Sequence, residues 1–387
     1  MAHALRLAEH GLFTTQPNPR VGCVIAHDGD VVAEGWHQRA GGAHAEVFAL
    51  RKAGELARGA SVYVTLEPCA HQGRTPPCAD ALIAAGVARV VIAVDDPFPQ
   101  VNGRGIEKLR AAGVTVETGL MREPARELNI GFFSRIERGR PFVRVKLAMS
   151  LDGRTALAHG ESKWITAEAA RADVQRWRAR SSAILTGSGT VLADNPRLTV
   201  RLANDSVSPL AERCADQVAW NAPATATSSA NGGCHEPESE HMTPPTRVVL
   251  DRQMRTPAGS HVLDGSVSTL VLHDVAASCA DDRFARVERM TVATHDGQCD
   301  LSAVLALLAD RGCNELQVEA GPILSGSLFA AGLVDELLLY VAPVLLGDSA
   351  RPLLKLPAIA DMAHRWQLRV VEQRLIGTDW RLRLRPA

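Results

Sequence analysis

The sequence has few aromatic residues and almost no excess charge of either sign. Aromatic residues make up 4% of the 387 positions, so any hydrophobic core must be built mainly from Ala, Leu and Val. Lys and Arg number 42 against 43 Asp and Glu, which gives a formal net charge of −1. A chain this close to neutrality has no general attraction for polyanions, which argues against a nucleic-acid or membrane-surface binder.

Long apolar runs are also missing, since none approaches the roughly 18–20 residues that span a bilayer. The segment 1–13 lacks the basic region, apolar stretch and cleavage site of a secretory signal. The eight cysteines are spread along a large chain, which suits reduced thiols better than a disulfide framework. We therefore predict a cytoplasmic protein without a membrane or nucleic-acid partner.

Strands alternate with short helices over residues 1–140, which predicts a layered α/β domain. The ranges assigned to this domain are helices at 2–10, 44–54, 78–86 and 105–113, a hairpin at 21–37, and strands at 61–68, 89–94 and 114–119. A second domain is predicted over 141–387. It begins with the strand 141–150 and ends with a hairpin at 366–385 that completes a mixed sheet.

Between these two segments of the second domain, further elements are expected. The ranges are a helix near 167–180, strands at 182–187, 247–251, 268–274 and 315–320, a helix near 323–332 and a strand within 335–347. Residues 203–246 are rich in Ser, Thr, Asn, Pro, Gly and Ala and predict a disordered insertion in a surface loop.

One constellation in the first domain has the spacing of a catalytic zinc site. His44 opens a predicted helix, Cys69 follows the end of a strand, and Cys78 starts the next helix. One imidazole and two thiolates give three zinc ligands and leave the fourth position open for water. Glu46 is not a ligand but is placed to transfer protons between that water and a leaving amine. This pattern matches the signature of the zinc nucleobase deaminases, although eight residues rather than two separate the cysteines.

A closed structural zinc site is the alternative, because His71 offers a fourth ligand in the same loop. That alternative leaves Glu46 without a role. A nucleic-acid-editing deaminase would share the three ligands but would need a basic groove and stacking aromatic residues, which the sequence lacks.

The strings TTQPNPRVGCVI, AGGAHAEVFAL and VYVTLEPCAHQGRTPPC resemble the deaminase half of the bifunctional riboflavin-biosynthesis deaminase/reductase family of bacteria. The resemblance implies a cytidine-deaminase-like three-layer α/β/α domain that binds one Zn²⁺. It implies that this domain hydrolytically deaminates a phosphorylated diaminopyrimidinone ribosylamine, with Asn18 near the pyrimidine. The family usually has DPNP where this chain has Phe98 within DPFP, so this chain departs from the family at the position of that Asn. In the family a few residues precede the first helix, so we expect the translation start upstream of Met1.

The second domain lacks the G-x-G-x-x-G fingerprint of common dinucleotide sites. It has instead a strand, glycine turn and helix at 315–332, in which Gly321 and Gly326 would allow backbone to approach a ligand. Taken alone, this pattern fits equally well a βα turn that binds nothing.

The segments KLAMSLDGRTA, GESKWIT, GSGTVLADNPRLTVR and EAGPILSGSL resemble the reductase half of the same family. The resemblance implies a dihydrofolate-reductase-like mixed-sheet α/β domain that uses NADPH. The residues that it implies for the cofactor are Ala148, Trp164, Thr190, Asp194, Gly321, Pro322, Ile323, Leu324, Ser325, Gly326 and Ser327. The residues that it implies for the phosphorylated substrate are Ser162, Arg178, Leu198, Arg201 and Glu319.

The side-chain chemistry agrees with this assignment at several positions. Arg178 and Arg201 offer forked donors that suit a phosphate, although a chain rich in arginine also places many on its solvated surface. Lys146 lies in an apolar strand of a chain that has only five lysines. We predict that Lys146 contacts substrate or assists proton transfer, with a snorkelling edge-strand lysine as the alternative.

The sequence thus predicts a two-step enzyme in which deamination precedes NADPH-dependent reduction of the ribosyl side chain to ribityl. We also expect a homo-oligomer. Two rivals remain: a degenerate reductase domain that serves only in oligomerisation, and a zinc-stabilised binding protein without catalytic activity.

Overall fold

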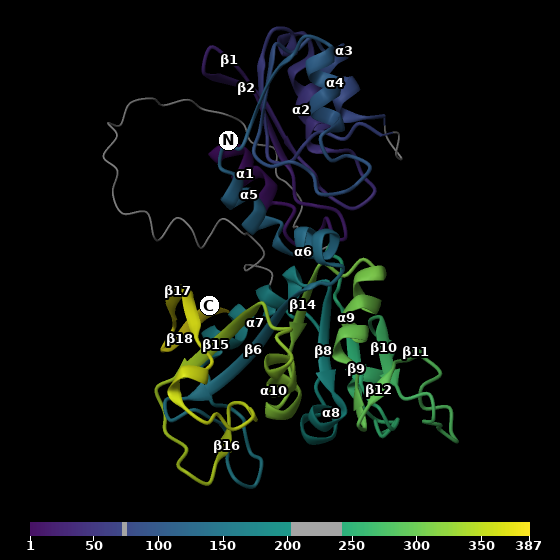
Figure 1. The fold of residues 1–387 in the computed structure, drawn as a ribbon, viewed down its shortest axis with the longest axis vertical. Coiled ribbons are helices and arrows are strands. Elements are labelled where there is room, and N and C mark those ends of the chain that lie inside the picture. The colour runs from purple at the N-terminus through teal and green to yellow at the C-terminus, as the bar shows by residue number, and fades with distance from the viewer. Residues whose placement is uncertain (72–75, 203–241) are drawn as a thin grey trace. The chain divides into compact units, whose positions relative to one another are not determined.

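The structure of the chain is a computed structural model that describes residues 1–71, 76–202 and 242–387. These residues form two compact units (Figure 1). The insertion expected at 203–246 falls mostly on residues 203–241, outside the described residues, and Thr246 is already the first residue of a strand. Among the described residues, no helix has the length and apolar character needed to cross a membrane.

The first unit is built on a five-stranded sheet in the order β2-β1-β3-β4-β5, with β1 antiparallel to both of its neighbours. Its strands are β1 (Gly22–His27), β2 (Asp30–Trp36), β3 (Ser61–Val64), β4 (Arg89–Ile92) and β5 (Thr115–Thr118). Its helices are α1 (Ala2–Glu9), α2 (Ala45–Ala53), α3 (Cys78–Ala84), α4 (Arg104–Ala111) and α5 (Arg122–Leu128). The alternating strands and helices expected from the sequence are confirmed.

Side-chain alternation along the strands explains why helices cover both faces of this sheet. Ile25 and Val62 point to one face and pack in a cluster with residues of α2, α3 and α4. Val24 and Tyr63, one residue removed, point to the other face and pack against α1. Because successive side chains of a strand point to opposite faces, both faces are apolar and both are covered. The result is the three-layer α/β/α arrangement.

The second unit contains a nine-stranded mixed sheet in the order β11-β10-β9-β8-β14-β6-β15-β18-β17. Its strands are β6 (Phe142–Ser150), β8 (Ala183–Gly187), β9 (Thr246–Leu250), β10 (Thr269–His273), β11 (Glu288–Thr291), β14 (Glu315–Val318), β15 (Glu336–Ala342), β17 (Leu368–Ile376) and β18 (Asp379–Pro386). The strands from β11 to β15 are parallel, and the final hairpin is antiparallel, as the sequence predicted.

Smaller strands and further helices complete the unit. The small strands are β7 (Arg154–Ala156), β12 (Thr294–His295), β13 (Gln298–Cys299) and β16 (Arg351–Pro352). The helices are α6 (Ile130–Arg138), α7 (Glu168–Arg180), α8 (Ser188–Asp194), α9 (Leu301–Asp310) and α10 (Pro322–Ala330). Helices α9 and α10 pack on one face of the sheet, with Val143, Val145 and Leu147 beneath them, and α7 covers part of the other.

The division between the units lies earlier than the boundary expected at residue 141. The second unit begins at Asn129 and includes α6. In α6, the Arg138 side chain donates to the Asp335 carboxylate at 2.7 Å, and Arg135 donates to Asn314 at 2.7 Å. Helix α6 is therefore part of the second unit, because its polar partners come from residues almost two hundred positions away.

Candidate functional site

Three side chains of the first unit converge on a cluster with the composition of a zinc site. The His44 Nδ1 atom lies 3.2 Å from the Sγ atom of Cys78 and 3.6 Å from that of Cys69. All three ligand atoms lie within 4.8 Å of one another, and they form the one such His, Cys or carboxylate group among the described residues. Imidazole and thiolate are donors that Zn²⁺ prefers, so this set fits the zinc ion that the sequence implies.

Local structure holds each of these ligands in place. His44 is the N-cap of α2, and Cys78 is the first residue of α3. The Cys78 backbone N–H donates to the Cys69 Sγ atom at 3.3 Å. This bond holds the two cysteines close together at the site. The hydrogen bond between the two thiols lowers the pKa of Cys69 to about 4 and raises that of Cys78, so Cys69 is the thiolate of the pair.

Glu46 lies in the first turn of α2, two residues after His44, and its side chain is buried. Burial raises the pKa of Glu46, while the charge of His44 opposes that shift. A carboxyl whose pKa is raised toward neutrality can both accept and return a proton at the operating pH. His71, the alternative fourth ligand, is absent from the ligand cluster found among the described residues. The open three-ligand arrangement is thus the one that the geometry favours.

His37 is part of this site, although the sequence analysis did not identify it. Its Nδ1 atom lies 2.9 Å from the Ala43 carbonyl oxygen, and its Nε2 atom lies 3.1 Å from the Asn18 Nδ2 atom. Its ring stands edge-on to the ring of His44, with centroids 5.6 Å apart. Burial lowers the pKa of His37, so the neutral ring donates from Nδ1 to the carbonyl and accepts the Asn18 amide at Nε2. His37 therefore connects Asn18 to the metal cluster, because it contacts both the Asn18 amide and the His44 ring.

Glu67 organises the loop that carries Phe98. Its carboxylate accepts hydrogen bonds from the backbone N–H groups of Gly103 and Gly105, both at 3.0 Å, and of Asp96 at 3.2 Å. The Phe98 ring lies with its centroid 6.3 Å from that of His71, in the cysteine loop. An apolar ring thus occupies the place where the family usually carries an amide.

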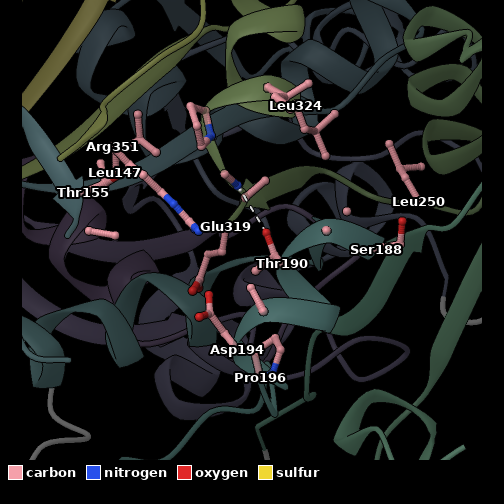
Figure 2. A pocket seen from close by; sticks show the side chains of 18 of the residues that line it. Leu147, Thr155, Ser188, Thr190, Asp194, Pro196, Leu250, Glu319, Leu324 and Arg351 are labelled. Atoms are coloured by element: carbon pink, nitrogen blue, oxygen red, sulfur yellow. Dashed lines mark hydrogen bonds between the residues drawn. The ribbon is translucent and has the colours of Figure 1, made fainter. Parts of the chain in front are cut away.

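The second unit has a cavity of about 880 Å³ at the carboxyl ends of its central strands (Figure 2). Thirteen of the predicted cofactor, substrate and catalytic residues line it: Lys146, Ala148, Ser162, Trp164, Thr190, Asp194, Leu198, Glu319, Gly321, Pro322, Ile323, Leu324 and Ser327. Thr190 links helix α8 to the glycine turn, because its Oγ1 atom accepts the Gly321 backbone N–H at 3.2 Å. An ideal Cβ at Gly321 would meet nothing closer than this Oγ1 atom, at 4.0 Å.

Four predicted residues lie outside the lining of this cavity: Arg178, Arg201, Ser325 and Gly326. Arg178 instead donates two parallel hydrogen bonds, of 2.6 and 2.8 Å, to the Glu319 carboxylate. It also donates to the Thr199 carbonyl at 2.9 Å. Gly326 permits a close approach of protein rather than ligand, since a Cβ there would lie 2.1 Å from the Lys355 carbonyl oxygen. Ser325 is buried and donates to the Ala320 carbonyl at 3.3 Å.

Lys146 lies on the face of β6 that also carries Arg144. Its neighbours Val145 and Leu147 face α10, so Lys146 faces the opposite side of the sheet, where its ammonium lies 5.9 Å from the centroid of the Tyr340 ring. Burial lowers the pKa of Lys146, and the charge of Glu319 partly offsets that shift. Burial raises the pKa of Glu319, but the charge and hydrogen bonds of Arg178 outweigh it and bring that pKa to about 2. The cavity wall thus carries the ionised carboxylate of Glu319 and the amine of Lys146, whose pKa is lowered.

The cavity also fits the nicotinamide dinucleotide that the sequence implies. The glycine turn leaves open space in front of Gly321, and Pro322 opens the nine-residue helix α10 there. The first turn of a helix presents free backbone N–H groups that suit a pyrophosphate. Five cationic side chains line the cavity (Lys146, Arg171, Arg252, Arg255 and Arg351), against the carboxylates of Asp194 and Glu319.

Comparison with known proteins gives the family. Residues 1–94 match the model of the cytidine and deoxycytidylate deaminase zinc-binding region, and residues 141–382 match that of the RibD C-terminal domain. The chain is 46% identical to the riboflavin biosynthesis protein RibD of Escherichia coli (strain K12), over 98% of this chain and 96% of that protein. The chain belongs to the RibD family. It is a bifunctional zinc-dependent deaminase and NADPH-dependent reductase of riboflavin biosynthesis.

Solved structures of other RibD proteins agree over the whole length. RibD of Acinetobacter baumannii is 41% identical with a TM-score of 0.85, and the match covers 100% of this chain and 97% of that one. A diaminohydroxyphosphoribosylaminopyrimidine deaminase/5-amino-6-(5-phosphoribosylamino)uracil reductase from Thermotoga maritima is 31% identical with a TM-score of 0.80, again over 100% and 97%. The expected pairing of a deaminase-like and a reductase-like RibD domain is confirmed.

Proposed function

We propose that the first unit deaminates a diaminopyrimidinone ribosylamine phosphate, the class of substrate for which the Thermotoga maritima relative is described. The observation that carries this proposal is the open His44, Cys69 and Cys78 cluster with Glu46 buried beside it. Zinc, when bound there, activates a water molecule for attack on the ring carbon that carries the amino group. The reaction consumes water and releases ammonia.

Glu46 moves the protons of this reaction. Its carboxylate accepts a proton from the attacking water and returns it to the ring nitrogen and the leaving amine. Asn18 stands beside the cluster with its amide N–H donated to His37, which leaves the amide oxygen to accept from the pyrimidine. Phe98 supplies an apolar contact at the edge of the ring, where the usual Asn would form a polar one.

In the second unit the deaminated product is reduced at its ribosyl carbon. NADPH, when bound in the cavity, supplies the hydride. Lys146 is placed to give the proton that the open-chain imine nitrogen takes up, because its lowered pKa makes it a better acid than an exposed lysine. Glu319 is held as a carboxylate by Arg178 and orients the ribose hydroxyl groups. Arg178 is a positioning residue in this arrangement, and the exposed Arg201 with Ser162 receives the substrate phosphate.

We further infer that the enzyme is a cytoplasmic homo-oligomer. Two observations support this: the zinc site needs reduced thiols, and an apolar patch is exposed on the final hairpin. The patch consists of Trp366, Val370, Leu375 and Trp380, which are 44–60% exposed.

The test is to incubate the zinc-loaded full chain with the diaminopyrimidinone ribosylamine phosphate, with and without NADPH. We expect ammonia release without NADPH, and NADPH oxidation only after ammonia has been released. A chelated sample serves as the control, because it should lose ammonia release while still oxidising NADPH when given the deaminated intermediate. NADPH oxidation that precedes ammonia release would refute the order, and a chain that never binds NADPH would refute the reductase assignment.

A further inference from the structure

Helix α7 covers a face of the second sheet that carries both apolar and ionisable side chains. Leu338 and Tyr340 of β15 pack there against α7, and Lys146 of the neighbouring strand β6 stands in register with Leu338. Lys146 lines the cavity, whereas Tyr340 is completely buried and does not line it. Tyr340 therefore lies behind the cavity wall, on the same face of the sheet as the amine.

The hydroxyl group of Tyr340 fixes the orientation of its ring. It donates to the Asp173 carboxylate of α7 at 2.6 Å. The same carboxylate accepts the Arg381 guanidinium of β18, with the Nη1 atom 2.9 Å from each of its oxygens. Asp173 and Arg381 are both buried, so these bonds are shielded from competition with water. Two elements other than β15 thus hold the ring in place.

The Tyr340 ring lies within reach of the Lys146 ammonium. The Lys146 Nζ atom is 5.9 Å from the ring centroid, inside the range of a cation–π interaction. Two further charged groups act on Lys146, the Glu319 carboxylate that follows β14 and the Arg178 guanidinium of α7. Burial lowers the pKa of Lys146, Glu319 raises it and Arg178 lowers it. Because Arg178 is bound to Glu319, the charges of this pair largely offset one another, and the ring is a separate source of stabilisation for the ammonium.

We propose that Tyr340 is a positioning residue for the reduction, and that its ring holds the Lys146 ammonium at the cavity wall and keeps the proton on it. This inference rests on the proposed function, in which Lys146 gives that proton to the imine nitrogen. An aromatic ring attracts an ammonium far more strongly than a neutral amine, so it favours the protonated form. The ring therefore limits the effect of burial, and the acid is present when the substrate arrives. In the reaction the imine nitrogen gains the proton that Lys146 loses, the carbon gains the hydride that NADPH loses, and Lys146 regains a proton from water.

The test compares two substitutions of Tyr340 in the full zinc-loaded chain. Tyr340→Phe and Tyr340→Leu both lose the hydrogen bond to Asp173, but only Tyr340→Leu loses the ring. The pKa of Lys146 is measured by NMR titration of isotope-labelled lysine, with its signal assigned through Lys146→Arg. We expect Tyr340→Leu to weaken proton binding at Lys146 by about 3- to 30-fold, which lowers its pKa by about 0.5 to 1.5. Tyr340→Phe keeps the aromatic face and should change that pKa by less than about 0.3.

The reductase rate gives a second readout. The acid form of Lys146 disappears as the pH rises through its pKa, so a lower pKa brings the alkaline fall of kcat to lower pH. With the deaminated intermediate and saturating NADPH, we expect this fall to move by the same amount as the pKa in Tyr340→Leu and to stay in place in Tyr340→Phe. A purely structural role of Tyr340 would change both variants alike, because both lose the Asp173 contact. Ammonia release by the first unit should be unaffected at every pH.

Thermal unfolding checks that each variant is folded. Tyr340→Met, which has a long flexible side chain without an aromatic face, replaces a Tyr340→Leu protein that does not fold. The same pKa of Lys146 with and without the ring would overturn the proposal, as would a higher pKa without the ring. Wild-type reduction rates in Lys146→Arg would instead overturn the proposed role of Lys146 as the acid, and this inference with it, because a guanidinium does not give up its proton near neutral pH.

Discussion

At the scale of single residues, substitution of Glu46 can distinguish proton transfer from metal binding. It is buried beside the zinc ligands but is absent from the ligand cluster. Glu46→Gln should therefore keep the fold and one zinc ion per chain while ammonia release falls by about 10²- to 10⁴-fold, the usual contribution of a general acid–base. Ammonia production and metal content measured on the same sample check this expectation.

The reductase reaction of the second unit is the control for this variant. NADPH oxidation with the deaminated intermediate should proceed at the wild-type rate, because the second unit has its own cavity. Ammonia release that survives the substitution would show that another group carries the protons, and loss of zinc would show that Glu46 supports the ligand set.

The residues of the metal site were predictable because they belong to short local motifs. Contacts between residues far apart in the sequence were not predictable. His44 and Glu46 are two positions apart on one helix, so their roles follow from the motif. Arg178 and Glu319 are 141 positions apart, and the forked donors that suggested a phosphate site turn out to grip a carboxylate. His37 gave no signal, since a lone histidine after a strand has many structural explanations.

At the scale of elements, helix α10 and its N-cap contain two glycines with different roles, Gly326 within the helix and Gly321 before it. Gly326→Ala should destabilise the fold by about 1–3 kcal/mol, because the new methyl group would meet the Lys355 carbonyl and overpack a buried contact. Gly321→Ala should leave stability nearly unchanged, because its φ of −72° suits any residue and the space before it is open. The same substitution should weaken NADPH binding, since it fills the space left for the ligand.

Thermal unfolding and NADPH titration of the two variants distinguish these tasks. A stable Gly326→Ala protein with weak cofactor binding would assign Gly326 to the ligand, as the sequence had suggested. A destabilised Gly321→Ala protein would show that the turn itself requires glycine.

The main elements of both units followed from apolar periodicity, but some helices did not. The apolar residues of α9 run almost without interruption (LSAVLALLAD), and such a run does not distinguish a buried helix from a buried strand. Helix α6 was not expected from the sequence, and its packing with the second unit depends on distant residues. It precedes β6 directly, but Arg135 and Arg138 bind residues that directly precede β14 and β15, which only the folded chain brings near.

At the scale of the whole molecule, the sheet of the second unit ends in an uncovered apolar surface. β17 is the edge strand of the described sheet, and Leu375 and Trp380 form a cross-strand pair exposed on it. Exposed apolar edges of this kind favour association with another chain. Leu375→Asp should therefore reduce the oligomeric state of the enzyme, as measured by light scattering over a range of concentrations.

Leu56→Asp is the matched control, because Leu56 is similarly exposed but belongs to the first unit. It should leave the oligomeric state as in the wild type. A wild-type enzyme that is monomeric throughout the concentration range would contradict self-association, and equal effects of the two substitutions would contradict this surface as the interface.

Because lysine is scarce in this chain, Lys146 is a selective target for chemical labelling of the reductase cavity. The chain has only four lysines besides Lys146, and burial lowers the pKa of Lys146, so its amine becomes nucleophilic at a pH where exposed lysines are still protonated. An acylating reagent would find few other amines, the N-terminal amine among them, and would modify the wall of the cavity. Protection of that one amine would then serve as a footprint of occupancy, which can be read by mass spectrometry without following either reaction.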